Sequence, residues 1–287
     1  GLTGDMLGIL FACKQDEWQK DLKEFGSTVC CADAVKRYAS IVDIHYYYKE
    51  NEGRSIARNY GLERAVGSYF IFFDSDCVIP EGYFEALNAV LNRHYTDCFG
   101  GPDAAHDSFS DVQKAINYSM TSFLTTGGIR GGKVQLEKFT PRTFNMGFSR
   151  EVYDRVGGFR EMFSEDIDMS TRIRQAGFGI SLIRDAFVYH KRRISMRVFF
   201  RQIYIFGMSR ISLYLLYPDT LKLVHWFPAC FVIGTLAMII ASFFWWPAIL
   251  PLAMYLFAVF LVSWCVNKRL KIAALSVVAS IIQLGEP

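Results

Sequence analysis

Hydrophobic residues occur in short runs through most of the chain and in long runs near its end. Two short runs, Ile44–Tyr48 and Tyr69–Phe73, are rich in β-branched and aromatic residues, which is typical of buried strands. Between them, residues 55–65 have helical composition and are soon followed by Gly67. The pattern therefore predicts a strand, a helix and a strand in succession, as in an α/β domain.

The same alternation continues on either side of this unit. A helix is expected over residues 80–93, because Pro80 and Glu81 suit a first helical turn. Another strand is expected to end at Gly100–Pro102, and residues 7–13 suit a strand near the start of the chain. Together these elements predict one α/β domain before the hydrophobic end.

The end of the chain is far more hydrophobic, with no Asp, Glu, Lys or Arg from Leu223 to Asn267. Within this stretch, Val224–Trp246 is long enough to cross a bilayer as a helix, and Ile249–Val266 follows after a short turn. A third run, Ile272–Leu284, is short for a span. We expect two transmembrane helices and a partial third one. The alternative is a set of buried helices in a soluble protein.

Basic residues beside the predicted spans set their orientation, because Lys and Arg near a span stay on the cytoplasmic side. They precede the first span or follow the second: Lys191, Arg192, Arg193, Arg197, Arg201, Arg210, Lys268, Arg269 and Lys271. The α/β domain is therefore expected in the cytosol. Residues 194–217 interleave arginines with apolar residues, which suits either a helix in the headgroup layer or an amphipathic helix packed on the domain.

Length and composition limit the classes of function. With 287 residues, the chain holds one domain of ordinary size and an appendage. The net charge is only +3 and no basic block occurs, so no nucleic acid is expected as a partner. The 7 cysteines include no C-x-x-C pair, which predicts neither a disulfide framework nor a zinc site.

Two carboxylates follow the predicted strand Tyr69–Phe73. Asp74 and Asp76 are separated by one residue, and ligands of open α/β sheets bind beyond the carboxyl ends of strands. Such a pair can share Mg²⁺ or Mn²⁺ with a diphosphate, because these ions prefer oxygen ligands. The alternative is a pair that only caps a turn.

A second acidic group, Ser164–Asp168, precedes a helical stretch over residues 169–175. Carboxylates at a helix N-terminus often serve only as caps. The functional interpretation is that Asp166 is a general base. It would take the proton of an attacking alcohol while a metal ion stabilises a departing diphosphate.

Several short motifs occur together between Tyr46 and His190. They are Gly53–Asn59 (GRSIARN), Ala65–Gly67 (AVG), Phe72–Asp76 (FFDSD), Phe144–Gly147 (FNMG), Gly157–Phe159 (GGF) and Glu165–Asp166 (ED). Their order and spacing resemble those of the family 2 glycosyltransferases with the GT-A fold. The resemblance implies an α/β fold with a mixed sheet and flanking helices. It also implies inverting transfer of a sugar from a nucleotide-diphosphate donor.

The resemblance further implies roles for the acidic residues. Asp74 would face the ribose of the nucleotide, Asp76 would bind Mg²⁺ or Mn²⁺, and Asp166 would be the catalytic base. His190 resembles a position that completes the metal shell in some GT-A enzymes, although a lone histidine is more often structural.

The donor site would include Glu24, Arg58, Asn145 and Glu165. Arg58 resembles a position that contacts the nucleotide, and the loop of Asn145 resembles the one beneath the donor sugar. Glu24 begins the segment EFGST, which is what remains of the family's acidic motif for the base and ribose. The family's opening Pro-x-Tyr-Asn loop is not recognisable, so the identity of the nucleotide stays open.

We therefore expect a GT-A domain over residues 1–190, an amphipathic interfacial segment over 191–220 and transmembrane helices over 221–287. The protein would be a multi-pass cell-membrane enzyme with a cytosolic catalytic domain and a lipid-linked or saccharide acceptor. Single addition is favoured, because the processive signature Q-x-x-R-W is absent after His190. One rival is a catalytically impaired membrane scaffold. Another, a nucleotidyltransferase, would need a basic, Gly-rich phosphate loop that the sequence lacks.

Overall fold

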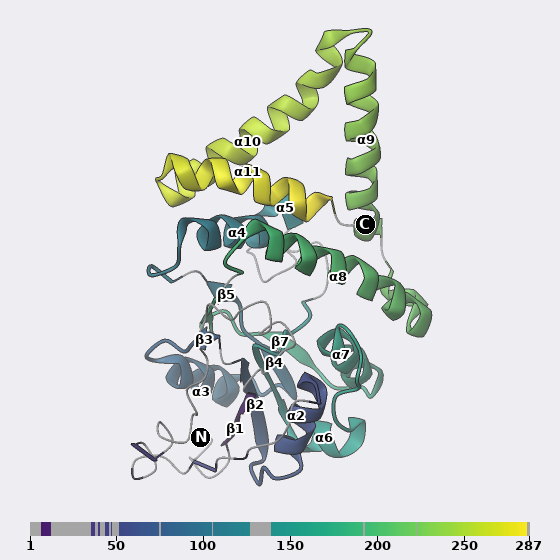
Figure 1. The fold of residues 1–287 in the computed structure, drawn as a ribbon. Helices are drawn as coiled ribbons and strands as arrows, with labels where there is room; N and C mark the ends of the chain where they lie inside the picture. The colour runs from purple at the N-terminus through teal and green to yellow at the C-terminus, as the bar shows by residue number, and fades with distance from the viewer. Residues whose placement is uncertain are drawn as a thin grey trace.

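The computed structural model describes residues 7–12, 36–37, 40, 44–45, 47, 52–74, 76–104, 106–126, 139–191, 193–221 and 223–285. Within these residues, an α/β domain is followed by a group of helices at the other end of the molecule (Figure 1). Glu24 lies outside the described residues. Of the strand predicted at residues 44–48, Ile44, His45 and Tyr47 are described and lie outside the helices and strands.

The domain is built on a five-stranded mixed sheet in the order β1-β2-β6-β4-β7. Its strands are β1 (Leu7–Ala12), β2 (Tyr69–Asp74), β4 (Cys98–Gly100), β6 (Asn145–Ser149) and β7 (Ile180–Leu182). β1 is parallel to β2 and β4 to β7, whereas β6 is antiparallel to both of its neighbours. A smaller sheet joins β3 (Cys77–Val78), β8 (Val188–His190) and β5 (Asp103–Ala104).

Helices cover both faces of the larger sheet. One face carries α2 (Arg54–Leu62), α6 (Arg150–Val156) and α7 (Glu165–Gln175), and the other carries α3 (Tyr83–Arg93). Two further helices, α4 (Asp111–Thr121) and α5 (Phe123–Thr126), pack instead against the last helix of the chain. Successive side chains of a strand point to opposite faces, and every side chain of β2 is buried. Tyr69, Ile71 and Phe73 pack with α3, whereas Phe70 and Phe72 pack with residues of α2 and α7. The continuous apolar run YFIFF is therefore a central strand that is buried on both faces.

Two motifs that are far apart in the sequence hold each other in place. The side chain of Asn59, on α2, accepts a hydrogen bond from the backbone N–H of Phe159 at 2.7 Å and donates one to its carbonyl oxygen at 2.8 Å. A Cβ at Gly158 would lie 2.4 Å from the Asn59 Oδ1 atom, so glycine is needed there. This contact fixes the segment that leads into α7 against α2.

Four helices follow the domain: α8 (Met196–Leu216), α9 (Phe227–Ser242), α10 (Leu250–Asn267) and α11 (Leu270–Leu284). Among the described residues, one helical stretch, Trp246–Asn267, is long and apolar enough to cross a membrane, which by itself is weak support for a span. α9 has 16 residues, fewer than the roughly 20 that a span needs. The prediction of two or three spans is thus supported for one helix, and a multi-pass arrangement is not supported.

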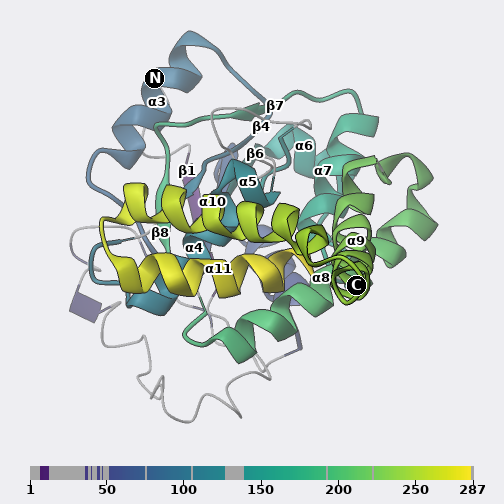
Figure 2. The same cartoon turned by 90° about the horizontal axis from the view of Figure 1, so that it is seen from above.

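α11, which the sequence predicts as a partial third span, lies along the α/β domain (Figure 1) and runs beside α10 (Figure 2). Its residue Ala279 belongs to a buried cluster with Ile116 of α4. At the start of α11, Arg269 and Lys271 contact Asp111 at 2.8 and 3.1 Å. One face of this apolar helix is therefore buried against protein.

Candidate functional site

The side chain of Arg58 joins two acidic residues from distant parts of the chain. Arg58 lies on α2 and is almost completely buried. It donates hydrogen bonds to Asp74 Oδ1 at 3.1 Å and to Glu165 Oε1 at 2.8 Å. Arg54, one turn earlier on α2, pairs with the other oxygen of Glu165 at 2.7 Å. Because Asp74 ends β2 and Glu165 begins α7, the two arginines hold both elements against α2.

Burial and charge act in opposite directions on this cluster. Burial favours the neutral form of Arg58, but the charges of Asp74 and Glu165 outweigh it and raise the pKa of the guanidinium. Burial raises the pKa of Glu165, and the charge of Asp166 adds to this effect, while Arg54 and Arg58 oppose it. Because a buried charge without its partner is costly, each member of the cluster constrains the positions of the others.

Asp166 lies beside this cluster, in the first turn of α7, and is partly exposed. Its Oδ1 atom accepts a hydrogen bond from the backbone N–H of Ile167 at 2.9 Å. Its Oδ2 atom lies 3.2 Å from the Arg142 Nη1 atom, in the segment before β6. Both oxygens are thus held in fixed directions, and a partly exposed, oriented carboxylate is suited to accept a proton.

A second acidic site lies where β3 meets β8. In this pair of strands Cys77 stands opposite His190, and Asp76 directly precedes Cys77. The Asp76 Oδ1 atom lies 3.3 Å from the His190 Nε2 atom, and the His190 Nδ1 atom lies 3.8 Å from a carboxylate oxygen of Asp103. The potential ligand atoms of Asp76, Cys77 and His190 all lie within 4.8 Å of one another.

This set of side chains fits a divalent ion such as Mn²⁺. Two ligands at a right angle, each about 2.1 Å from an ion, stand about 3 Å apart, which is close to the 3.3 Å between Asp76 and His190. An imidazole suits a first-row ion better than Mg²⁺, which prefers oxygen ligands. Asp103 stands where a carboxylate would orient the imidazole of a metal-bound histidine.

The two sites are parts of one ring, in which side-chain contacts are linked by short stretches of chain. Arg142 pairs with Asp166, and two residues later Phe144 stacks on His190 with ring centroids 4.4 Å apart. The complete ring, here called the charged ring, consists of Asp74, Arg58, Glu165, Asp166, Arg142, Phe144, His190 and Asp76. It closes because Asp76 and Asp74 are separated by a single residue. The acidic residues after β2 and at the start of α7 therefore belong to one connected site.

Within the charged ring, the two aspartates after the central strand have different partners. Asp74 is the last residue of β2 and contacts Arg58, whereas Asp76 lies beyond the strand and contacts His190. The Asp74 carboxylate thus belongs to the arginine cluster, and the Asp76 carboxylate belongs to the candidate metal site.

Asn145 is not a member of the ring. It is completely buried in β6, where its Oδ1 atom accepts a hydrogen bond from the Tyr83 hydroxyl at 2.6 Å. Its Nδ2 atom donates to the carbonyl oxygen of Ala186 at 2.8 Å. Both polar groups of the side chain bond to other parts of the protein. The loop around Asn145 can therefore lie beneath a donor sugar, but the Asn145 side chain itself does not reach that sugar.

Three residues that support the site were not singled out from the sequence: Arg54, Arg142 and Asp103. Arg54 and Arg58 are four residues apart on one helix face, so that spacing could have indicated a shared acidic partner. Arg142 lies in irregular backbone and Asp103 in a strand of 2 residues, where no periodic pattern exists to reveal them.

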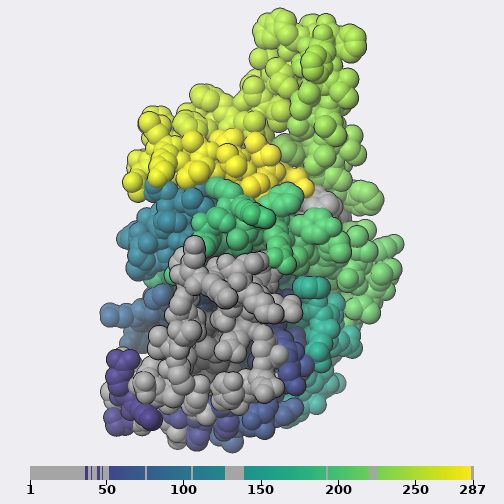
Figure 3. Space-filling view, viewed as in Figure 1, coloured from purple at the N-terminus to yellow at the C-terminus, as the bar shows by residue number. Residues whose placement is uncertain are grey.

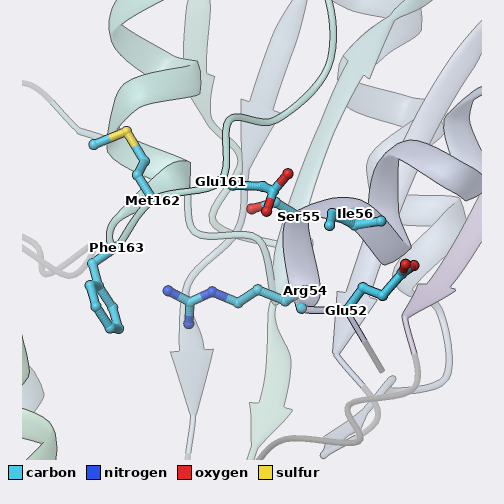
Figure 4. Close-up of a pocket in the computed structure, with 8 residues that line it drawn as sticks. Glu52, Arg54, Ser55, Ile56, Glu161, Met162 and Phe163 are labelled. Atoms are coloured by element: carbon cyan, nitrogen blue, oxygen red, sulfur yellow. The ribbon is translucent and has the colours of Figure 1, made fainter. Parts of the chain in front are cut away.

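A pocket of about 320 Å³ opens beside Arg54, the arginine that pairs with Glu165. It is lined by Glu52, Gly53, Arg54, Ser55, Ile56, Glu161, Met162 and Phe163. Arg54 reaches from the start of α2 toward Phe163, while Glu52 and Ile56 lie on the other side of the helix start (Figure 4). The volume is within the range of about 300–1,000 Å³ for small-molecule sites, and the Arg54–Glu165 pair connects the pocket to the charged ring.

Comparison with known proteins shows which families and proteins this chain is similar to. Residues 26–157 match the family described as "Glycosyl transferase family 2". A stretch of 68 residues is 38% identical to the minor teichoic acid biosynthesis protein GgaB of Bacillus subtilis and covers 24% of this chain and 7% of that protein. A stretch of 184 residues is 23% identical to glycosyltransferase AglE of Haloferax volcanii and covers 57% of this chain and 55% of that protein. The chain thus matches about half of AglE and a small part of GgaB.

A solved structure shares the overall architecture. The mannosyltransferase PcManGT from Pyrobaculum calidifontis, in complex with GDP-Man and Mn²⁺, superposes with a TM-score of 0.58 at 14% identity. The match covers 97% of this chain and 87% of that chain. It shows that the fold of this chain is GT-A, as the resemblance of the sequence motifs implies.

Proposed function

Because residues 26–157 of this chain belong to glycosyl transferase family 2, we propose that the protein is an inverting glycosyltransferase that uses a nucleotide-diphosphate sugar as its donor. The acceptor is a hydroxyl or phosphate oxygen of a membrane-associated molecule, either a lipid-linked glycan or a cell-surface saccharide precursor. Transfer adds one sugar at a time.

The observation that carries this proposal is the charged ring, which connects Asp74 and Asp76, after β2, to Asp166, at the start of α7, through five side-chain contacts and short stretches of chain. In the proposed reaction, Asp166 takes the acceptor proton as the acceptor oxygen forms a bond to the anomeric carbon. The bond from that carbon to the donor diphosphate breaks on the opposite face, which inverts the configuration. The diphosphate leaves with the electron pair.

The residues of the charged ring on the donor side would orient the nucleotide and each other, and would not take part in proton transfer. We assign Asp74 to the ribose of the nucleotide, with Glu24 as a further contact. Arg58 is almost completely buried and bonds to two carboxylates, so it acts on the donor by orienting Asp74 and Glu165. This assignment differs from direct contact between Arg58 and the nucleotide, because both terminal nitrogens of the guanidinium already donate to carboxylates of the protein.

Asp76 and His190 are the residues that would hold a divalent ion, with Mn²⁺ favoured over Mg²⁺ by the imidazole ligand. The ion would supply positive charge to a departing diphosphate. PcManGT, solved with GDP-Man and Mn²⁺, is consistent with such an ion in the same fold.

The helical end of the chain supports a place at a membrane. Trp246–Asn267 is apolar over 22 residues with few buried side chains, which suits a helix surrounded by lipid. The basic residues that flank it favour a cytosolic catalytic domain at the cell membrane. A catalytic site tethered there would meet lipid-linked acceptors at high effective concentration.

The experiment that tests this function is a donor screen with the full-length protein in detergent, with and without a chelator. The panel contains UDP and GDP sugars, and the released nucleotide is measured. We expect hydrolysis or transfer with one nucleotide class, lost on chelation and restored by Mn²⁺. If no donor is turned over and none protects the protein from thermal unfolding, the enzyme assignment is wrong and the scaffold alternative is supported.

Two substitutions separate binding from chemistry once the donor is known. Asp166→Asn should lower transfer by about 10²–10⁴-fold, the usual contribution of a general base, and leave donor affinity intact. Asp76→Ala should abolish the Mn²⁺ dependence of donor binding. Asp154→Asn, at an exposed aspartate of α6, is a matched control that should retain transfer. Intact transfer in Asp166→Asn contradicts the assignment of the base.

A further inference from the structure

α8 has two apolar faces, and within the described part of the chain only one of them belongs to a buried cluster. Phe199, Ile203 and Leu213 are buried, and the first two belong to the cluster shared with α4 and α11. A second row of side chains, each about half exposed or more, follows the helical repeat on another face: Phe200, Tyr204, Met208, Ile211 and Leu215. This row is here called the α8 stripe. α8 lies open on the viewed face of the molecule, below α11 (Figure 3).

Lipid is the partner that fits the α8 stripe. The helix carries Arg197, Arg201 and Arg210 and has no acidic residue, a charge pattern that suits an anionic headgroup layer. The stripe is also continuous along the chain with the apolar helices α9 and α10, whose side chains are largely exposed. A bilayer that surrounds those helices would reach the α8 stripe, whereas a protein partner would not require the exposed arginines Arg197 and Arg201.

Two hydrogen bonds attach α8 to the helix that carries the proposed base. The hydroxyl groups of Ser164 and Ser209 lie 2.8 Å apart. Because the Ser209 hydroxyl donates to the carbonyl oxygen of Phe206, the bond between the two serines is donated by Ser164. Ser164 immediately precedes α7 and has a left-handed backbone conformation with a φ of 61°. Residues other than glycine rarely adopt this conformation, so surrounding contacts stabilise it.

The second attachment is made by Tyr217, which directly follows the last residue of α8. The hydroxyl group of Tyr217 donates to the Asp168 Oδ1 atom at 2.6 Å, and the Arg160 Nη1 atom donates to the Tyr217 oxygen at 3.1 Å. Asp168 is completely buried in the first turn of α7, two residues after Asp166. α8 and the residue that follows it therefore contact side chains on both sides of Asp166 in the sequence.

We propose that α8 couples contact with an anionic bilayer to the position of Asp166, with Ser209 and Tyr217 as positioning residues. Lipid bound to the α8 stripe fixes the helix, and the two hydrogen bonds transmit this position to the first turn of α7. The reaction then proceeds fastest where the acceptor resides. This inference rests on the proposed function, because it assumes that Asp166 is the base.

The first test asks whether the α8 stripe meets lipid. The full-length protein is placed in nanodiscs that contain brominated phosphatidylglycerol, which quenches nearby tryptophan fluorescence. Ile211→Trp adds a reporter on the stripe, and Ser212→Trp adds one at the next, exposed position off the stripe. After subtraction of the parent signal, we expect the added tryptophan at position 211 to be quenched several-fold more. Equal quenching at the two positions overturns the lipid assignment.

The second test asks whether the attachment positions the base. Transfer is measured in nanodiscs of phosphatidylcholine with and without phosphatidylglycerol. Ser209→Ala and Tyr217→Phe should each lower kcat about fivefold in anionic discs, the effect of one hydrogen bond, and reduce the stimulation by anionic lipid. Donor affinity and lipid quenching should stay at the parent level, because neither substitution touches the donor residues or the stripe.

The controls keep the two hypotheses apart. Ser212→Ala and Tyr214→Phe make the same chemical changes at exposed positions of α8 and should behave as the parent protein. If Ser209→Ala and Tyr217→Phe keep the parent kcat and lipid response, the coupling is wrong even though the enzyme is active. If donor affinity falls together with kcat, the residues have only a structural role, and the coupling is again wrong. Full transfer by Asp166→Asn would instead refute the assignment of the base.

Discussion

Arg58→Met removes the cation that bridges Asp74 and Glu165 while it keeps a side chain of similar length. The guanidinium makes hydrogen bonds of 3.1 and 2.8 Å to the two carboxylates in an almost completely buried position. Breaking a buried ion pair by removing one partner costs about 3–5 kcal/mol, because the remaining charge stays buried. Arg54 still pairs with Glu165 in this variant, so we expect a loss near the lower end of that range.

The assay is thermal unfolding of the full-length protein in detergent, followed by helical circular dichroism. A loss of 1 kcal/mol lowers Tm by roughly 2–4 °C in a protein of this size, so Arg58→Met should lower Tm by about 6–12 °C. Arg58→Lys keeps the charge without the planar fork, and we expect about half of this loss. Arg93→Met, at an exposed arginine that ends α3, is the matched control and should change the free energy of unfolding by less than about 0.5 kcal/mol.

The pH dependence of the loss gives an independent check. Without the guanidinium, the carboxylates of Asp74 and Glu165 lose the charge that favours their ionised forms. Protonation relieves this penalty, so the deficit of Arg58→Met should shrink as the pH falls from neutrality toward mild acid. A Tm within about 1 °C of the parent protein, or a deficit that does not change with pH, would refute the idea that Arg58 holds the two carboxylates together.

Three further predictions concern other contacts. Asn59→Ala removes two hydrogen bonds to the backbone of Phe159 and should lower the free energy of unfolding by about 1–3 kcal/mol in the same assay. Burial outweighs the two arginines and raises the pKa of Glu165 above its ordinary value of 4.5, so the pH-dependent part of its contribution to stability is fully present below that value and is lost as the pH rises. The parent protein should therefore gain stability relative to Glu165→Gln on acidification, and a constant difference would contradict this sign. Asp111→Asn should speed hydrogen exchange in α11 at neutral pH; the hydrogen bond from Lys271 lowers the pKa of Asp111 below 3.8, so the difference should disappear only in stronger acid.

The central elements of the fold follow from local pattern. The run YFIFF is apolar at every position, as a strand buried on both faces must be, and the structure has β2 at Tyr69–Asp74. The helix predicted at residues 80–93 is present as α3, which begins at Tyr83, and the predicted strand near residue 7 is present as β1. In each case the information lies within one segment, so the sequence alone reveals it.

The membrane prediction shows where local pattern is insufficient. Apolar composition indicates that a helix is shielded from water, but contact with protein and contact with lipid shield it equally well. α11 buries one face on α4 and α8, which no run length could indicate. Within the run Val224–Trp246, α9 covers only Phe227–Ser242 and follows a 3-10 helix at Leu223–Trp226, and the length of the run does not reveal this division.

The sequence by itself determined which residue types stand after the central strand and at the start of α7, because each motif is continuous and its spacing is local. Only the tertiary structure decided their partners. Arg58 contacts Glu165, which is 107 residues away in the sequence. Phe144, in the turn before β6, stacks on His190 in β8. Such contacts are set by how helices pack on the sheet, and a side chain's burial and its charged neighbours follow from that packing. The same reason explains why Asn145 lies inside the protein while Arg142, three residues earlier, reaches Asp166.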